Sequence, residues 1–269
     1  MTVRSRCGRL PTGVLVLAVA LGGVPPAAGA APGPSARVPR ALRVQVRAAL
    51  PHDREAFTQG LELHDGLLYE GTGLTGRSVV TVGPVGGELS RRVALGAEFF
   101  GEGITVVGDR LWQLTWREGV AFERDARTLA ELRRVRYEGE GWGLCAQPAR
   151  LVMSDGSSTL FFRDPRDFGK RGSVTVTENG RPLERLNELE CAADGSVYAN
   201  VWPTDRIVRI DPASGEVTAA VDASGLLGPA DRTEGVGVLN GIAHVPGTDE
   251  YLVTGKNWPW MFRVAFVSA

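Results

Sequence analysis

Two charged side chains and three tryptophans are the residues of this sequence best suited to chemistry. Glu102 could transfer a proton, because a positioned carboxylate can act as a general acid or base. Lys256 could stabilise negative charge that develops during a reaction. Trp116, Trp142 and Trp202 could form the apolar walls that a small-ligand pocket needs. The question is which elements would bring them together.

A short motif recurs five times and predicts those elements. The motif appears as Gln59-Gly60-Leu61, Glu102-Gly103-Ile104, Trp142-Gly143-Leu144, Asn187-Glu188-Leu189 and Asn240-Gly241-Ile242. Successive copies are 43, 40, 45 and 53 residues apart, which is the length of a four-stranded propeller blade. No segment carries the 3.6-residue apolar period of an amphipathic helix.

Alternating strands follow each motif and support the blade interpretation. Second strands are expected at 66–70, 110–114, 151–154, 196–200 and 250–254, and third strands at 78–82, 120–124, 159–163, 206–210 and 261–264. The fifth repeat ends after its third strand, while an unpaired strand at 42–47 precedes the first repeat. The sequence therefore predicts an all-β, five-bladed β-propeller of four-stranded antiparallel blades, in which the N-terminal strand closes one blade and leaves no open edge. We expect a single domain over residues 41–269.

In a propeller, the first strand of every blade lines the central channel. The first residues of the five motifs would form a ring around this channel: Gln59, Glu102, Trp142, Asn187 and Asn240. The end of each second strand, 14 to 16 residues later, would return to the same mouth and bring Gly73, Trp116, Gly156, Trp202 and Lys256 there. A simpler interpretation is that such polar groups only hydrogen-bond one another, above all Gln59 and Asn240, and that the tryptophans only pack between blades. Convergence of three tryptophans beside Glu102 and Lys256 favours a ligand pocket.

The N-terminal residues indicate export. Arg4, Arg6 and Arg9 precede an apolar run at 13–21, and small residues at 27–30 follow, so residues 1–30 are expected to be a secretory signal peptide cleaved near Ala30. Residues 31–40 are predicted to be a disordered lead-in. The mature protein is expected to be secreted or periplasmic, with no membrane association.

Composition limits the partners. With 30 Lys and Arg against 31 Asp and Glu, the net charge of −1 gives no reason to expect a nucleic acid. Three scattered histidines, His52, His64 and His244, lack metal-ligand spacing, so no metal is expected. Cys145 and Cys191 could pair in an oxidising compartment, and two separate buried thiols remain the alternative. A monomer is the default expectation.

The chain resembles the plant-type and bacterial glutaminyl-peptide cyclotransferases, which are five-bladed propellers. The stretches that carry the resemblance occur in order over nearly the whole mature chain: 57–61, 70–73 with 76–78, 100–103, 141–144, 154–156, 186–190, 200–202, 239–242 and 254–259. The resemblance implies conversion of an N-terminal glutaminyl residue of a peptide or protein to pyroglutamyl, with release of ammonia. No step of such a reaction needs a cofactor. The resemblance places the catalytic carboxylate on Glu102 and further site positions on Trp116, Trp142, Asn187, Trp202 and Lys256. Phe100 lies in one of these stretches and, with Gln59 and Asn240, is expected to contact substrate.

One carboxylate could serve both proton transfers of such a reaction. Glu102 would take a proton from the attacking amine and give it to the leaving nitrogen. We assign Lys256 to the developing oxyanion and Asn187 to the substrate amine or amide, with the exchanged assignment left open. The pKa of Glu102 is not decided by the sequence, because burial raises it and Lys256 lowers it.

Two other functions fit parts of the sequence. A non-catalytic secreted propeller would use the three tryptophans to bind a small ligand or peptide without ammonia release. A calcium-dependent lactonase or a lyase would need clustered carboxylates or a catalytic histidine, and the ring offers one carboxylate and no histidine.

Overall fold

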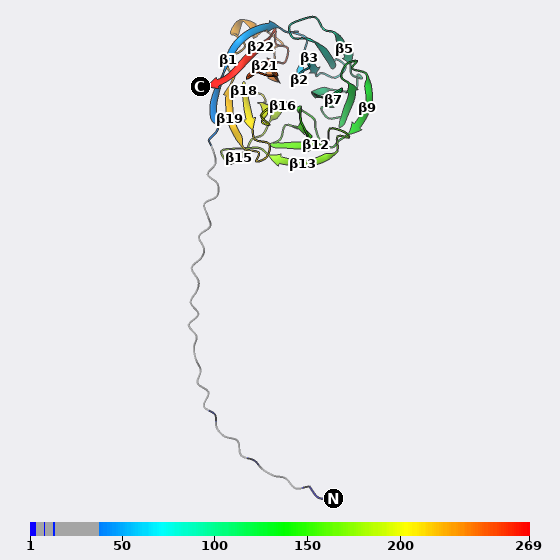
Figure 1. Ribbon diagram of the computed structural model, residues 1–269, viewed down its shortest axis with the longest axis vertical. Coiled ribbons are helices and arrows are strands. Elements are labelled where there is room, and N and C mark those ends of the chain that lie inside the picture. The colour runs from blue at the N-terminus through cyan, green and yellow to red at the C-terminus, as the bar shows by residue number, and fades with distance from the viewer. Residues whose placement is uncertain (4–7, 9–12, 14–37) are drawn as a thin grey trace. The chain divides into compact units, whose positions relative to one another are not determined.

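Strands of four residues or more recur in sets of four around a common axis in the computed structural model, which describes residues 1–3, 8, 13 and 38–269 (Figure 1). Most of the predicted signal peptide and most of the predicted lead-in lie outside the described residues. Within the described part of the chain the only helical element is a 3-10 turn, η1 (Pro229–Asp231), and no helix there is long and apolar enough to cross a membrane. The chain is therefore all-β, as predicted.

Five blades build the ring. The first is β2 (Thr58–His64), β3 (Leu67–Thr72), β4 (Val79–Pro84) and β5 (Arg91–Ala94); the second is β6 (Gly101–Val107), β7 (Arg110–Thr115), β8 (Val120–Asp125) and β9 (Glu131–Arg136). The third is β10 (Leu144–Gln147), β11 (Arg150–Met153), β12 (Thr159–Arg163) and β13 (Lys170–Thr175); the fourth is β16 (Leu186–Cys191), β17 (Val197–Val201), β18 (Arg206–Ile210) and β19 (Val217–Asp222). A small hairpin of β14 (Thr177–Glu178) and β15 (Arg181–Pro182) joins the third blade to the fourth.

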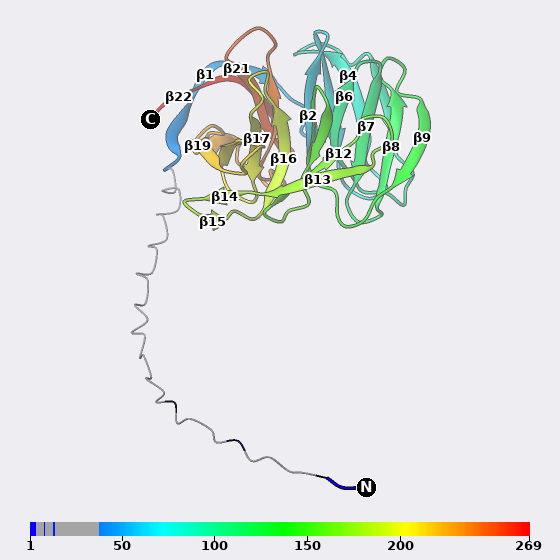
Figure 2. The same ribbon diagram turned by 60° about the horizontal axis from the view of Figure 1, so that its bottom comes forward.

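The fifth blade takes its outer strand from the start of the propeller. β20 (Leu239–His244), β21 (Glu250–Gly255) and β22 (Trp260–Ser268) are completed by β1 (Arg40–Pro51), which pairs antiparallel with β22 (Figure 2). This confirms the predicted closure, although β1 is longer than the expected strand at 42–47. β1 also pairs in parallel with β19 of the fourth blade, from Arg40 beside Ala219 to Arg43 beside Asp222. The last two blades therefore share one eight-stranded sheet, which the sequence had not indicated.

Apolar faces of neighbouring blades pack together in five separate clusters, one in each interface. Ile104 and Phe122 of the second blade, for example, pack with Val80 of the first. The alternation of the strands puts one side chain in two on each blade face, so every blade is apolar on both sides. Local turns agree with this register: Asp65 and Gly66 both have positive φ, as the tight hairpin between β2 and β3 requires.

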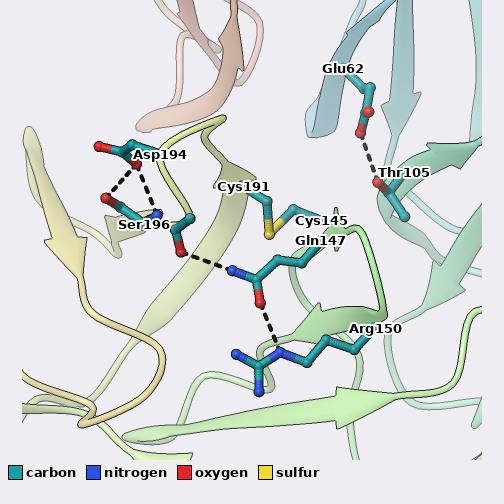
Figure 3. Close-up of a disulfide and its surroundings, with 9 residues drawn as sticks. Glu62, Thr105, Cys145, Gln147, Arg150, Cys191, Asp194 and Ser196 are labelled. Atoms are coloured by element: carbon teal, nitrogen blue, oxygen red, sulfur yellow. Dashed lines mark hydrogen bonds between the residues drawn. A yellow bond between two sulfur atoms is a disulfide. The ribbon is translucent and has the colours of Figure 1, made fainter.

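Two cysteines of the propeller form a disulfide. Cys145 on β10 and Cys191 on β16 are bonded, with their Cα atoms 5.4 Å apart (Figure 3). This settles the alternative left open by the sequence. Gln147 adds a hydrogen bond of 2.9 Å from its side-chain amide to the carbonyl of Gly195, which also links the third blade to the fourth.

Candidate active site

A cavity of about 620 Å³ opens at the mouth of the ring where the inner strands begin. Its walls come from all five blades and their loops: Phe57, Gln59, Phe100, Glu102, Trp116, Arg117, Glu140, Trp142, Asn187, Trp202, Gly237, Val238 and Lys256. Eight of the nine residues expected at the site line this cavity. The exception is Asn240.

Breaks in the strand ladders position the ring residues. In four blades the pairing between the first and second strands shifts register at the repeated motif, between Thr58 and Gly60, Gly101 and Ile104, Leu186 and Leu189, and Leu239 and Ile242. In the third blade the paired strand begins only after Trp142 and Gly143. Such bulges re-aim side chains, and here they fall at Gln59, Glu102, Asn187 and Asn240.

Glu102 is the buried acidic group of the cavity. Its residue is 4 % exposed, and Oε1 accepts a hydrogen bond of 2.9 Å from Nε2 of Gln59. No donor within residues 38–269 reaches the other oxygen, Oε2. Burial raises the pKa of Glu102 well above the usual range; Lys256 opposes this, while Glu140 and Glu118 add to it. The direction that the sequence could not decide is therefore upward, and one oxygen is left for a ligand.

Lys256 brings a cation to the same cavity. It follows β21 and is 7 % exposed, with Nζ 4.7 Å from the ring centroid of Phe57. Burial lowers the pKa of Lys256, and the charge of Glu102 partly restores it. The ammonium therefore lies in a poorly hydrated place, where its electrostatic effect on a bound group is large.

Asn187 presents an acceptor. The residue is 3 % exposed, and its side-chain Oδ1 has no hydrogen-bond partner among the described residues. Its backbone carbonyl accepts a hydrogen bond of 2.7 Å from Ser154, which holds the strand in place. A buried acceptor without a partner is costly, so this oxygen is suited to an N–H of a ligand.

The three tryptophans line the walls of the cavity. Trp142 and Trp202 meet edge to face, with ring centroids 6.0 Å apart, and Trp116 packs on Phe100 at 5.4 Å. Trp202 is 36 % exposed and forms the rim. Gly156 has a φ of +82°, and a Cβ there would lie 2.6 Å from the Trp142 ring, so only glycine fits beneath that indole.

Asn240 is placed differently from expectation. It is fully buried and does not line the cavity. Its Nδ2 donates to Oε1 of Gln59 at 3.1 Å and to the carbonyl of Thr58 at 2.9 Å. The simpler interpretation, a polar group that bonds to its neighbours, therefore describes Asn240, which lies behind Gln59.

Five lining residues were missed by the sequence analysis: Phe57, Arg117, Glu140, Gly237 and Val238. Glu140 is the most informative, because its Oε2 accepts hydrogen bonds from both Trp116 and Trp142. It also makes the cavity a site with two carboxylates instead of one. The sequence offered one indication of its place at the site: Glu140 lies two residues before Trp142, which belongs to the ring of repeated motifs.

The three histidines of the chain lie away from this mouth. His52, His64 and His244 do not line the cavity. Across the described ranges, no group of three or more His, Cys, Asp or Glu residues is arranged to hold a metal ion.

The fold and the site together define a five-bladed propeller enzyme with one buried carboxylate and one ammonium in an aromatic cavity. The sequence model of the glutamine cyclotransferase family matches residues 15–266. The chain belongs to this family.

Two relatives support the assignment. The chain is 38 % identical over 238 residues to the glutaminyl-peptide cyclotransferase of Arabidopsis thaliana, covering 86 % of this chain and 73 % of the plant protein. The crystal structure of Myxococcus xanthus glutaminyl cyclase matches with a TM-score of 0.78 and 38 % identity, covering 86 % of this chain and 99 % of that one.

Proposed function

We propose that this protein converts the N-terminal glutaminyl residue of peptides or proteins to pyroglutamyl, with release of ammonia. Family membership supports the reaction, and one observation carries its assignment to this cavity. A buried carboxylate, Glu102, keeps one oxygen without a partner beside a buried ammonium, Lys256. The indole walls would hold the glutamine side chain folded toward its own amine, which raises the rate by orientation.

The proposed reaction needs two proton transfers and one exchange of C–N bonds. The uncharged α-amine attacks the side-chain amide carbon, and Oε2 of Glu102 takes a proton from that nitrogen. The tetrahedral carbon then expels the amide nitrogen, which receives the proton and leaves as ammonia. The lone pair on the oxygen returns to form the lactam carbonyl, so Glu102 ends in its starting form.

Lys256 and Asn187 have separate roles in this proposal. Lys256 donates toward the substrate oxygen as negative charge develops there, which lowers the barrier most strongly in a site without bulk water. The unpaired Oδ1 of Asn187 accepts an N–H of the substrate amine or amide. No step uses a metal or an organic cofactor.

An ammonia-release assay tests the function. A peptide beginning with Gln should be cyclised, whereas the same peptide beginning with Asn or Glu should release no ammonia. Glu102→Gln should fold and lose about 10²–10⁴-fold in kcat, the usual contribution of a positioned acid or base. Tight peptide binding without ammonia release would support a binding protein instead. Activity abolished by a chelator and restored by Zn²⁺ would contradict the metal-free step.

We also propose that the protein acts outside the cytoplasm. The arginine-led apolar run at 13–21 supports export, and the Cys145–Cys191 disulfide fits an oxidising compartment. Mass spectrometry of exported protein should give a mature N-terminus near Ala31, and an intact N-terminus on active protein would contradict the proposal.

A further inference from the structure

Glu140 ties two walls of the cavity together through one carboxylate. Its Oε2 accepts hydrogen bonds from Nε1 of Trp116 at 2.8 Å and from Nε1 of Trp142 at 3.0 Å. Its Oε1 accepts a third from Nε of Arg117 at 3.0 Å, and the guanidinium of Arg117 lies 3.7 Å from the Trp116 ring centroid. Two indoles from different blades thus share one acceptor atom.

The backbone around Glu140 is itself fixed. Glu140 lies between β9 and β10, in the loop that leads to Trp142, and the next residue, Gly141, donates its backbone N–H to the carbonyl of Trp116 at 2.9 Å. Trp116 in turn donates its backbone N–H to Phe100 at 3.0 Å. These backbone hydrogen bonds fix the loop that carries Glu140, and the Glu140 carboxylate in turn fixes the two indole rings.

We propose that Glu140 is a positioning residue for the cyclisation, which fixes the indoles of Trp116 and Trp142 so that they fold the glutaminyl side chain onto its amine. The inference rests on the proposed function. Hydrogen bonds to an ionised acceptor are the strong ones, and an indole N–H that loses its acceptor in a partly buried place, as here, carries a desolvation cost. Without Glu140 each ring would rotate toward another hydrogen-bond partner. Small displacements of the groups that orient a substrate lower the rate of reaction strongly.

The charge of Glu140 has a second effect. Burial acts to raise the pKa of Glu140, but hydrogen bonds from Trp142, Trp116 and Arg117 hold it below its usual value, so the group is anionic at neutral pH. That negative charge adds to the upward shift that burial gives the pKa of Glu102. Removing the charge should move the acid limb of the pH profile, whereas removing the acceptor should move the rings. These two effects can be separated.

Glu140→Ala and Glu140→Gln make the separation, with Gln-initiated peptide as substrate. Alanine removes acceptor and charge; glutamine removes the charge but keeps an oxygen that both indoles can reach. We expect Glu140→Ala to lose roughly 10- to 100-fold in kcat/KM, mainly in kcat, from the size of hydrogen bonds to charged groups. Glu140→Gln should stay within about 5-fold of the parent by the same reasoning, and both should shift the acid limb to lower pH. Glu131→Ala is the matched control, because Glu131 also pairs with an arginine, Arg134, on an exposed strand outside the cavity.

Parent-level kcat/KM in Glu140→Ala would overturn the proposal, as would equal losses in the two variants. Neither outcome touches the proposed function, which depends on ammonia release by the parent. If Glu140→Ala does not fold, a cycle of Glu140→Met with Trp142→Phe decides the question, because methionine fills the space without an oxygen acceptor and phenylalanine keeps a ring but has no N–H. Strong non-additivity in kcat supports the shared hydrogen bond, and fully additive losses overturn it.

Discussion

The side-chain amide of Gln59 donates a 2.9 Å hydrogen bond to one oxygen of Glu102, and these two residues occupy the same place in neighbouring repeats. Asn240 occupies the same place in the fifth repeat, and its side-chain amide donates a hydrogen bond to Gln59. The result is a chain of three side chains across the fifth, first and second blades. It fixes the carboxylate in rotation and leaves Oε2 for the substrate.

Gln59→Leu should therefore change the protonation of Glu102. A hydrogen bond donated to a carboxylate favours its charged form, so losing it raises the pKa of Glu102 further. The acid limb of kcat/KM should therefore move to higher pH. Gln147→Leu is the control, since Gln147 bonds to Gly195 outside the cavity. An unmoved limb in Gln59→Leu would show that the bond does not act on catalysis.

Lys256→Met and Asn187→Leu should separate the two substrate contacts. Methionine keeps the length of Lys256 and removes its charge, so kcat should fall about 10²–10³-fold with little change in KM, as for loss of an oxyanion donor. Asn187→Leu removes an acceptor that contacts the substrate both when it binds and when it reacts. In this variant KM should rise and kcat should fall. Steady-state kinetics with a Gln-initiated peptide checks both, and the reverse pattern would exchange the two assigned roles.

The free energy of unfolding should be greatest at mildly acidic pH. Burial raises the pKa of Glu188 well above its ordinary range, with the charge of Glu190 adding to it. Burial and the charge of Glu62 likewise raise the pKa of Glu190. Burial also raises the pKa of Glu62 to about 7. The folded protein thus binds more protons than the unfolded chain from about pH 4.5 to neutrality, so the free energy of unfolding falls as pH rises there.

Urea unfolding at pH 5 and pH 8 measures this difference. We expect the protein to be more stable at pH 5 by at least about 2 kcal/mol, given about 1.4 kcal/mol for each unit of a pKa shift. Below about pH 4 the trend should reverse, because hydrogen bonds, chiefly those that Thr128 donates, lower the pKa of Asp125. Glu62→Gln should flatten the neutral part of the curve, and greater stability at pH 8 would contradict the prediction.

Reduction of the disulfide should cost stability more than activity. Cys145 and Cys191 close a loop with a sequence separation of 46, so the oxidised protein should gain about 2–4 kcal/mol in free energy of unfolding. Urea titrations with and without dithiothreitol check this. Cys145→Ala with Cys191→Ala should be insensitive to the reductant, and a parent protein with equal midpoints in both conditions would refute the prediction.

The blades could be predicted because the signals are local. Each strand alternates on its own, and every hairpin joins segments adjacent in sequence, so period and turn residues sufficed. The parallel contact between β1 and β19 could not be found this way, since it joins residues 40–43 to 219–222 and follows from ring geometry alone.

The site shows the same division. Equal repeat positions placed Glu102 and Asn187 at the mouth, but bulges decide where such side chains point, and so Asn240 lies behind the cavity wall. Glu140 was missed because it belongs to a loop, where no strand periodicity marks which side chains face the axis. Its role depends on two indole N–H groups whose meeting point only the folded chain defines.

The closing strand also sets an order of events during synthesis. β1 is made first, yet its antiparallel partner β22 spans Trp260–Ser268, near the end of the chain. During synthesis, the pairing groups of β1 that face β22 stay unused until the other strands of the propeller have emerged, although residues 40–43 can pair with β19 earlier. Every copy of the chain carries the same β1, so the unpaired edge of β22 in one nascent chain is equally complementary to the β1 of another. A chaperone that covers residues 40–51 would prevent this pairing between copies and would have to release these residues last.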